Sequence, residues 1–201
     1  MTLDNKFGIT NSAKLAKLEE KLSKTRALEL FDKHLLSQFE VGTFDGLAQI
    51  HHYLFSDIYD FAGKVRTVNV AKGNFCFAPV IYLPSVLQQI SQMPQSTFDE
   101  IMEKYVEMNV AHPFREGNGR SMRIWLDAIL KQETGQVVDW CRIAKGDYLL
   151  AMEHSPIKDT EIKTLLKIAL TNQIHDREVY TRGIDQSYYY EGYRSFTTDH
   201  L

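Results

Sequence analysis

The chain has few cysteines and lacks long apolar runs. Two cysteines, Cys76 and Cys141, among 201 residues are too few for a disulfide framework or a cysteine-rich zinc site. No apolar run approaches the ~20 residues that span a bilayer, and residues 1–11 lack the basic and apolar regions of a signal peptide. These absences predict a soluble, reduced, cytoplasmic protein that does not associate with membranes.

The chain also lacks an excess of positive charge. It contains 23 Lys and Arg against 26 Asp and Glu, a formal net charge of −3. Its basic residues are spread along the chain without an aromatic-interleaved patch, which argues against a nucleic-acid partner. No repeat, low-complexity tract or Gly/Ser linker divides it. At about 150 residues per domain, we expect a single domain over residues 1–201, with a core at about residues 40–170.

Most apolar residues recur at helical spacing, which predicts an all-α fold. Asn11 or Ser12 can cap a first helix, and Thr97 with Glu100 has the form of a capping box. The helix after that box must end near His112, because the following proline disfavours helical geometry there. The second central helix is expected to begin after Gly119, and Gly135 can close it. The other helices are expected around residues 47–58, 83–90, 148–153, 160–170 and 184–191.

Residues 65–79 depart from the helical spacing. Side chains alternate along residues 65–70, residues 72–74 can turn the chain, and Phe75 and Phe77 resume the alternation. This pattern predicts one β-hairpin in an otherwise helical protein. A lone hairpin has little stability of its own, so we expect it to lie against the helices.

The segment from His112 to Arg120 lies between the two predicted central helices. Gly117 and Gly119 allow consecutive backbone N–H groups to converge on one point. The helix that follows directs its positive end to the same point, and Arg120 and Arg123 add two guanidinium groups. This concentration of donors predicts a site for a polyphosphate.

Two further residues of this segment suit phosphate chemistry. Glu116 is a carboxylate beside an anion site, which is expected where Mg²⁺ lies between carboxylate and phosphates. A neutral His112 could take a proton from a hydroxyl that attacks a bound phosphate. Each feature alone is more typical of an ordinary turn, helix end or solvated face. Nine contiguous positions and Arg123 together fit one chemistry, which favours a single site.

These residues match, at every specified position, the signature of the Fic family, His-x-Phe-x-[Asp/Glu]-Gly-Asn-Gly-Arg-x-x-Arg. The chain resembles this family over most of its length. Fic proteins are helical enzymes, most of which transfer AMP from ATP to a hydroxyl of a target protein and release pyrophosphate. The resemblance implies that His112 is the general base and that Glu116 holds Mg²⁺.

The resemblance also implies a phosphate nest at residues 117–119 and a homo-oligomeric state. The hairpin resembles the family's flap, on which a target protein docks, here around residues 72–79. Close relatives often carry a basic residue where this chain has Cys76, which leaves the choice of target open. The residues expected to bind ATP are Lys72, Gly73, Asn109, Gly117, Asn118, Gly119, Arg120 and Arg123.

The C-terminal residues 184–192 allow two interpretations. Taken alone, they predict a terminal helix whose tyrosines pack on the surface and which ends at a glycine. The Ser-x-x-x-Glu-Gly pattern that begins at Ser187 also resembles the inhibitory motif of Fic proteins. That resemblance implies that Glu191 pairs with Arg123 and keeps activity low. Tyr188 is then a candidate for self-modification if the tail is released.

Other functions remain open at this point. Glu191 could instead activate water, in an enzyme that removes AMP from targets or performs both reactions. Phosphotransfer from ATP is disfavoured, because the Fic-related toxins that catalyse it carry lysine at the position of Gly119. A non-catalytic nucleotide-binding module of toxin–antitoxin type is disfavoured because the motif residues are intact.

Overall fold

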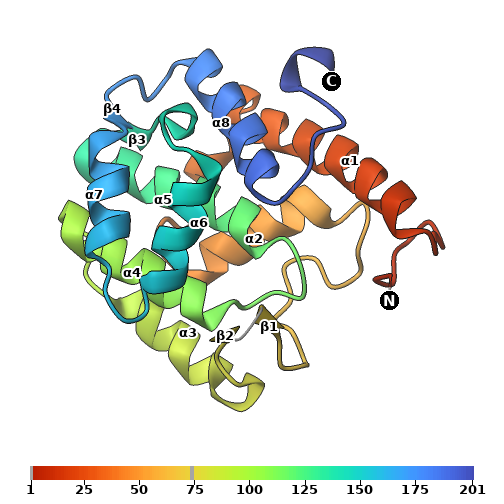
Figure 1. Ribbon diagram of the computed structural model, residues 1–201, viewed down its shortest axis with the longest axis horizontal. Helices are drawn as coiled ribbons and strands as arrows, with labels where there is room; N and C mark the ends of the chain where they lie inside the picture. The colour runs from red at the N-terminus through yellow and green to blue at the C-terminus, as the bar shows by residue number, and fades with distance from the viewer. Residues whose placement is uncertain (1, 73–74) are drawn as a thin grey trace.

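The computed structural model describes residues 2–72 and 75–201 as a mostly helical fold (Figure 1). Eight α-helices and four short 3₁₀ segments lie within these residues. The helices are α1 (Ser12–Asp32), α2 (Phe44–Phe55), α3 (Leu83–Gln92), α4 (Phe98–Ala111), α5 (Asn118–Thr134), α6 (Lys145–His154), α7 (Thr160–Ile168) and α8 (Arg177–Tyr190). The 3₁₀ segments are Leu35–Gln38, Val80–Tyr82, Trp140–Arg142 and Thr198–His200.

Local capping explains where several helices begin and end. Asn11 caps α1 by accepting a hydrogen bond from the backbone of the third residue along, at 2.9 Å. The predicted capping box of Thr97 and Glu100 is present in both directions at the start of α4. Gly135 ends α5 in the left-handed conformation, as predicted. Helix α8 begins earlier than residue 184, because the side chain of Asp176 caps it.

Helices α4 and α5 form the centre of the fold. They pack against each other, and α5 also contacts α2 and α8 (Figure 1). Ile101 and Tyr105 of α4 and Trp125 and Leu126 of α5 are buried, which confirms the predicted central helix pair. Helix α5 begins at Asn118, two residues earlier than expected, so residues 118–120 form its first turn. The loop from α4 to α5 is therefore fixed by buried helices at both ends.

The predicted hairpin is present but shorter than expected. Strands β1 (Ala71–Lys72) and β2 (Phe75–Cys76) pair antiparallel. The prediction that residues 65–70 form a strand was wrong. The Arg66 N–H donates to the Pro113 carbonyl at 2.8 Å and not to a neighbouring strand. The base of the hairpin is thus attached to the loop between α4 and α5.

A second antiparallel pair was not predicted. Strands β3 (Val137–Val138) and β4 (Leu170–Thr171) join the segment after α5 to the segment after α7. Two residues per strand are too few to show an alternating pattern, so the sequence gives no local signal for it. Among the described residues, none of the helices has the length and apolar character needed to cross a bilayer.

Candidate active site

The loop from His112 to Gly117 connects α4 to α5 and contains most of the candidate site. His112 ends α4 in the left-handed conformation, with φ 47°. Gly117 precedes α5 with φ 78°, a conformation that glycine adopts without strain. A Cβ at this position would lie 2.5 Å from the ring of Phe55. The glycine is thus required by backbone conformation and by space.

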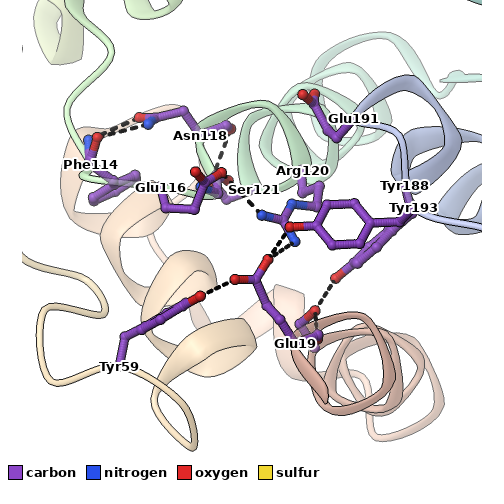
Figure 2. A network of polar contacts seen from close by, with 12 residues as sticks. Glu19, Tyr59, Phe114, Glu116, Asn118, Arg120, Ser121, Tyr188, Glu191 and Tyr193 are labelled. Atoms are coloured by element: carbon purple, nitrogen blue, oxygen red, sulfur yellow. Dashed lines mark hydrogen bonds and ion pairs between the residues drawn. The ribbon is translucent and has the colours of Figure 1, made fainter. Parts of the chain in front are cut away.

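The side chain of Asn118 fastens this loop to itself. Its Oδ1 accepts the Phe114 N–H at 2.9 Å, and its Nδ2 donates to the Phe114 carbonyl at 2.8 Å (Figure 2). Asn118 was predicted to bind ATP. Because its side chain is committed to the loop, only its backbone N–H is available for a phosphate.

His51 of α2 supports the same loop and was not identified from the sequence. Its Nδ1 accepts the Gly63 N–H at 2.9 Å, so Nε2 carries the proton and donates to the Glu116 carbonyl at 2.8 Å. Its ring stacks on Phe114 at 3.8 Å. Burial lowers the pKa of His51 to about 3, which keeps the ring neutral. A neutral histidine is therefore part of the scaffold of the loop.

His112 lies between the loop and the hairpin. Its ring stacks on Phe77 at 3.7 Å, and its Nδ1 is buried without a hydrogen-bond partner in the described part of the chain. Burial lowers the pKa of His112 to about 4, and the positive charges of Arg66 and Lys72 act in the same direction against the carboxylate of Glu191. At neutral pH the imidazole is uncharged, the state that a general base requires.

Arg123 and Glu191 form the ion pair that the resemblance implied. Nη2 of Arg123 lies 2.8 Å from Oε1 of Glu191, and Nε donates to the hydroxyl of Ser187 at 2.7 Å. A Cβ on Gly119 would lie 2.4 Å from the same carboxylate oxygen. The absence of a side chain at Gly119 therefore makes room for this pair above the first turn of α5.

Charge explains why Glu191 is ionised there. Burial raises its pKa, but the attraction and hydrogen bond of Arg123 outweigh burial, so that the pKa of Glu191 is lowered. Lys72, on β1, adds a smaller stabilising charge. The Arg123 guanidinium is buried, with the rings of Tyr148 and Tyr190 each 5.4 Å from its central carbon. The donors of Arg123 are thus occupied in this conformation.

Arg120 takes a different position from Arg123. Its side chain is 1% exposed, and its Nη1 lies 2.6 Å from Oε1 of Glu19 on α1 (Figure 2). The rings of Tyr188 and Tyr193 lie 5.3 and 4.6 Å from its guanidinium carbon. Glu116 accepts from its second nitrogen at 3.3 Å. The phosphate contact expected of Arg120 stays a prediction, and it would require this buried pair to open.

The remaining predicted residues lie around the same loop. The side chain of Glu116 is 46% exposed, and its Oε1 accepts the Gly117 N–H at 2.9 Å. Lys72 is exposed on β1, and Asn109 lies half-buried one turn before the end of α4. Gly73 lies outside the described residues.

Tyr188 is not accessible in this structure. Its side chain is 1% exposed, its hydroxyl donates to Ser23 at 2.7 Å, and burial raises its pKa to about 12. A hydroxyl that is buried and hydrogen-bonded inside the fold cannot reach the proposed base or a bound nucleotide. Self-modification at Tyr188 therefore stays a prediction for a state in which α8 has left its place.

Known proteins resemble this chain in sequence and in fold. The Fic/DOC family profile matches residues 42–130. Protein adenylyltransferase VbhT of Bartonella schoenbuchensis is 31% identical over 197 residues, covering 90% of this chain but 40% of VbhT. A probable protein adenylyltransferase Fic of Salmonella typhimurium is 27% identical over 166 residues, covering 77% of this chain and 80% of that protein.

The fold has close counterparts among solved structures. BepC of Bartonella tribocorum, crystallised with bound AMPPNP, matches with a TM-score of 0.68 at 21% identity, covering 85% of this chain and 93% of that one. The mostly helical arrangement described above is therefore the Fic fold, and the sequence resembles the Fic/DOC family over residues 42–130. The two relatives are named as a protein adenylyltransferase and a probable one, and the chain spans less than half of VbhT.

Proposed function

We propose that this protein is an autoinhibited protein adenylyltransferase, which transfers AMP from ATP to a tyrosine, threonine or serine hydroxyl of a target protein. The main observation in support is that a neutral His112 lies at the start of the loop that leads into α5. At the end of this loop, backbone N–H groups and the helix dipole favour the binding of phosphate. The names of the relatives support the same reaction.

The transfer follows from the chemistry of these groups. The target hydroxyl oxygen attacks the α-phosphorus of ATP, the bond from that phosphorus to the bridging oxygen breaks, and pyrophosphate leaves. His112 accepts the hydroxyl proton. Such reactions depend on positioning and charge stabilisation more than on covalent catalysis. The N–H groups of residues 117–119 and the guanidinium of Arg123 are the donors proposed to hold the phosphates.

Glu116 fits the role of a Mg²⁺ ligand. Its carboxylate is half-exposed at the edge of the loop, and its Oε1 is already oriented by the Gly117 N–H. A single protein carboxylate with substrate phosphates is a usual environment for Mg²⁺. When bound, the ion would neutralise charge on the phosphates.

Removing the Glu116 carboxylate should therefore raise the metal requirement. We expect Glu116→Ala to need at least about tenfold more Mg²⁺ for half-maximal AMP transfer, since even outer-shell metal contacts contribute about 10–100-fold. The measurement is transfer of labelled AMP during a Mg²⁺ titration, with Glu107→Ala on the exposed face of α4 as control. An unchanged Mg²⁺ dependence would exclude this role.

The hairpin is the proposed docking site for the target. The stacking of Phe77 on His112 brings the hairpin next to the proposed base. An extended target segment could add to its edge by backbone hydrogen bonds, which would deliver a hydroxyl to His112. Docking over residues 72–79 and a homo-oligomeric state both stay predictions.

The pairing of Glu191 with Arg123 is the proposed basis of autoinhibition. While Glu191 holds this guanidinium, the γ-phosphate of ATP lacks a partner and meets a carboxylate. ATP bound in this way would have its α-phosphate out of line for attack. The conformation described here is accordingly the one with low activity.

Replacing Glu191 with glycine should activate the protein. The Arg123 contact that becomes available to ATP contributes about 1.5–3 kcal/mol, which corresponds to roughly ten- to a hundredfold in rate. We expect label from ATP to enter proteins of a cell lysate faster by this factor. Mass spectrometry of the labelled bands would identify the modified hydroxyl.

The controls separate activation from loss of helix structure. Glu178→Gly alters the exposed first turn of the same helix and should leave the rate unchanged. The double variant Glu191→Gly/Arg123→Ala should lose the activation. If Glu191→Gly is no faster than wild type at saturating Mg-ATP, α8 is not inhibitory. If neither protein labels anything, the proposed transferase activity is wrong.

Removal of AMP is a second candidate, favoured by the state of Glu191. Its carboxylate is ionised and lies next to the first turn of α5, and its side chain is 25% exposed, so that it could orient a water molecule. Incubation with an AMP-modified target and Mg²⁺ or Ca²⁺ distinguishes the two reactions. Release of AMP that is lost in Glu191→Gly would support this second activity.

A further inference from the structure

Arg66 is buried where the hairpin meets the end of α4. The residue is 3% exposed, and its own N–H donates to the Pro113 carbonyl. Its guanidinium donates to four backbone carbonyls. These belong to Val68 at 2.8 Å, Ala78 at 2.5 Å, Ala111 at 3.2 Å and His112 at 2.8 Å.

The partners of Arg66 are unusual for a buried guanidinium. All of its hydrogen-bond acceptors in the described part of the chain are backbone oxygens. Two of them, on Ala111 and His112, belong to the end of α4, where carbonyls lack helical partners and carry the negative end of the helix dipole. The other two belong to the two sides of the hairpin base. One side chain therefore joins the end of α4 to both sides of the hairpin.

His112 needs such a restraint. It is one of two non-glycine residues with positive φ among the described residues, and this conformation is strained for a residue with a Cβ. Strained residues persist where surrounding contacts hold them. The Arg66 Nε–H bond to the His112 carbonyl fixes the backbone, while Phe77 covers the ring.

We infer that Arg66 is a positioning residue for AMP transfer, which holds the His112 backbone and the hairpin base as one unit. This inference rests on the proposed function of His112 as the base. The base and the hydroxyl delivered by the hairpin then keep a constant separation. Arg66 itself contacts neither ATP nor the reacting oxygen in this assignment. It acts on the rate of the chemical step and not on nucleotide affinity.

The first test is Arg66→Lys in the Glu191→Gly background. An ammonium keeps the charge but cannot reach four carbonyls in the planar arrangement of a guanidinium. We expect the rate of labelled AMP transfer at saturating ATP to fall about 10–100-fold, while the ATP concentration for half-maximal rate changes less than about twofold. Arg26→Lys, at an arginine paired with Asp57 away from the site, is the control and should change neither value.

The second test uses His112→Ala in the same background. If Arg66 acts through His112, adding Arg66→Lys to this variant should cause no further loss in the residual rate, because the two effects are not additive. A loss of the same size in both backgrounds would overturn the inference. So would a full rate in Arg66→Lys.

The remaining outcomes are also decisive. If neither Arg66→Lys nor Arg66→Gln unfolds cooperatively, Arg66 is required for folding and is not specifically a positioning residue. If the Glu191→Gly parent transfers no AMP, the proposed function fails. An active parent with an insensitive Arg66→Lys variant would refute the positioning role alone.

Discussion

Replacing His112 with alanine is expected to lower the rate of AMP transfer by about 10²–10⁴-fold, the usual loss for a general base. The ring is neutral at physiological pH, since burial holds its pKa near 4. It lies against Phe77 of the hairpin, where the target is proposed to dock. ATP binding should persist, because the phosphate donors belong to the loop backbone and to Arg123.

The measurement is label incorporation by Glu191→Gly/His112→Ala against Glu191→Gly alone, so that inhibition does not mask the result. ATP affinity, measured by calorimetry, should agree within a few-fold between the two proteins. His154→Ala, at an exposed histidine of α6, is the control and should keep the parent rate. Turnover near the parent rate in the His112 variant would end its assignment as the base.

The sequence predicted those features whose causes lie close together in the chain. The cap at Asn11 and the box of Thr97 and Glu100 depend on neighbours within one helical turn, and both are present. The loop from His112 to Gly117 also follows from local residues. The Arg123–Glu191 pair joins residues far apart, and it was found because the motif resemblance named both of them.

The supports of the loop could not be predicted in this way. The partners of His51 and Arg66 are backbone atoms, most of them in distant segments, and any residue type supplies such atoms. A sequence pattern therefore carries no signal for them. Only the packing of α2 and of the hairpin against the loop reveals which side chains hold it.

The charged residues of α1 show the same limit more sharply. Glu19, Glu20 and Lys24 carry charges that usually face water on a helix, yet all three are buried. The segment after α8 covers them, and Glu20 accepts the backbone N–H of Ser195 at 2.9 Å. Burial of a charge depends on what the fold places over it. This information is in the topology and not in the helix itself.

Glu19 is the most consequential of these residues. It accepts from Arg120 and from the hydroxyls of Tyr59 and Tyr193 (Figure 2). Burial raises its pKa, but the charge of Arg120 and these hydrogen bonds outweigh burial and lower it below the usual value. The ionised form therefore stabilises the fold above the pKa of Glu19 in the unfolded chain. This contribution is lost as the pH falls through the lower pKa of the folded state.

Glu19→Ala should lower the free energy of unfolding by about 3–5 kcal/mol, because it leaves the buried Arg120 guanidinium without its partner. The loss is expected to exceed that of Glu19→Gln, which keeps an acceptor for the tyrosine hydroxyls but still removes the charge. Urea unfolding at pH 7 measures the free energy of unfolding of both variants. The control is Glu153→Ala, at an exposed position of α6, which should stay within about 0.5 kcal/mol of wild type. Glu19→Ala also removes the acceptor of the Tyr193 hydroxyl, so the segment two residues beyond Glu191 should be held less firmly against α1. A loss below about 1 kcal/mol in Glu19→Ala would mean that Arg120 finds another partner or water, and that the pair is not a structural link between α1 and α5.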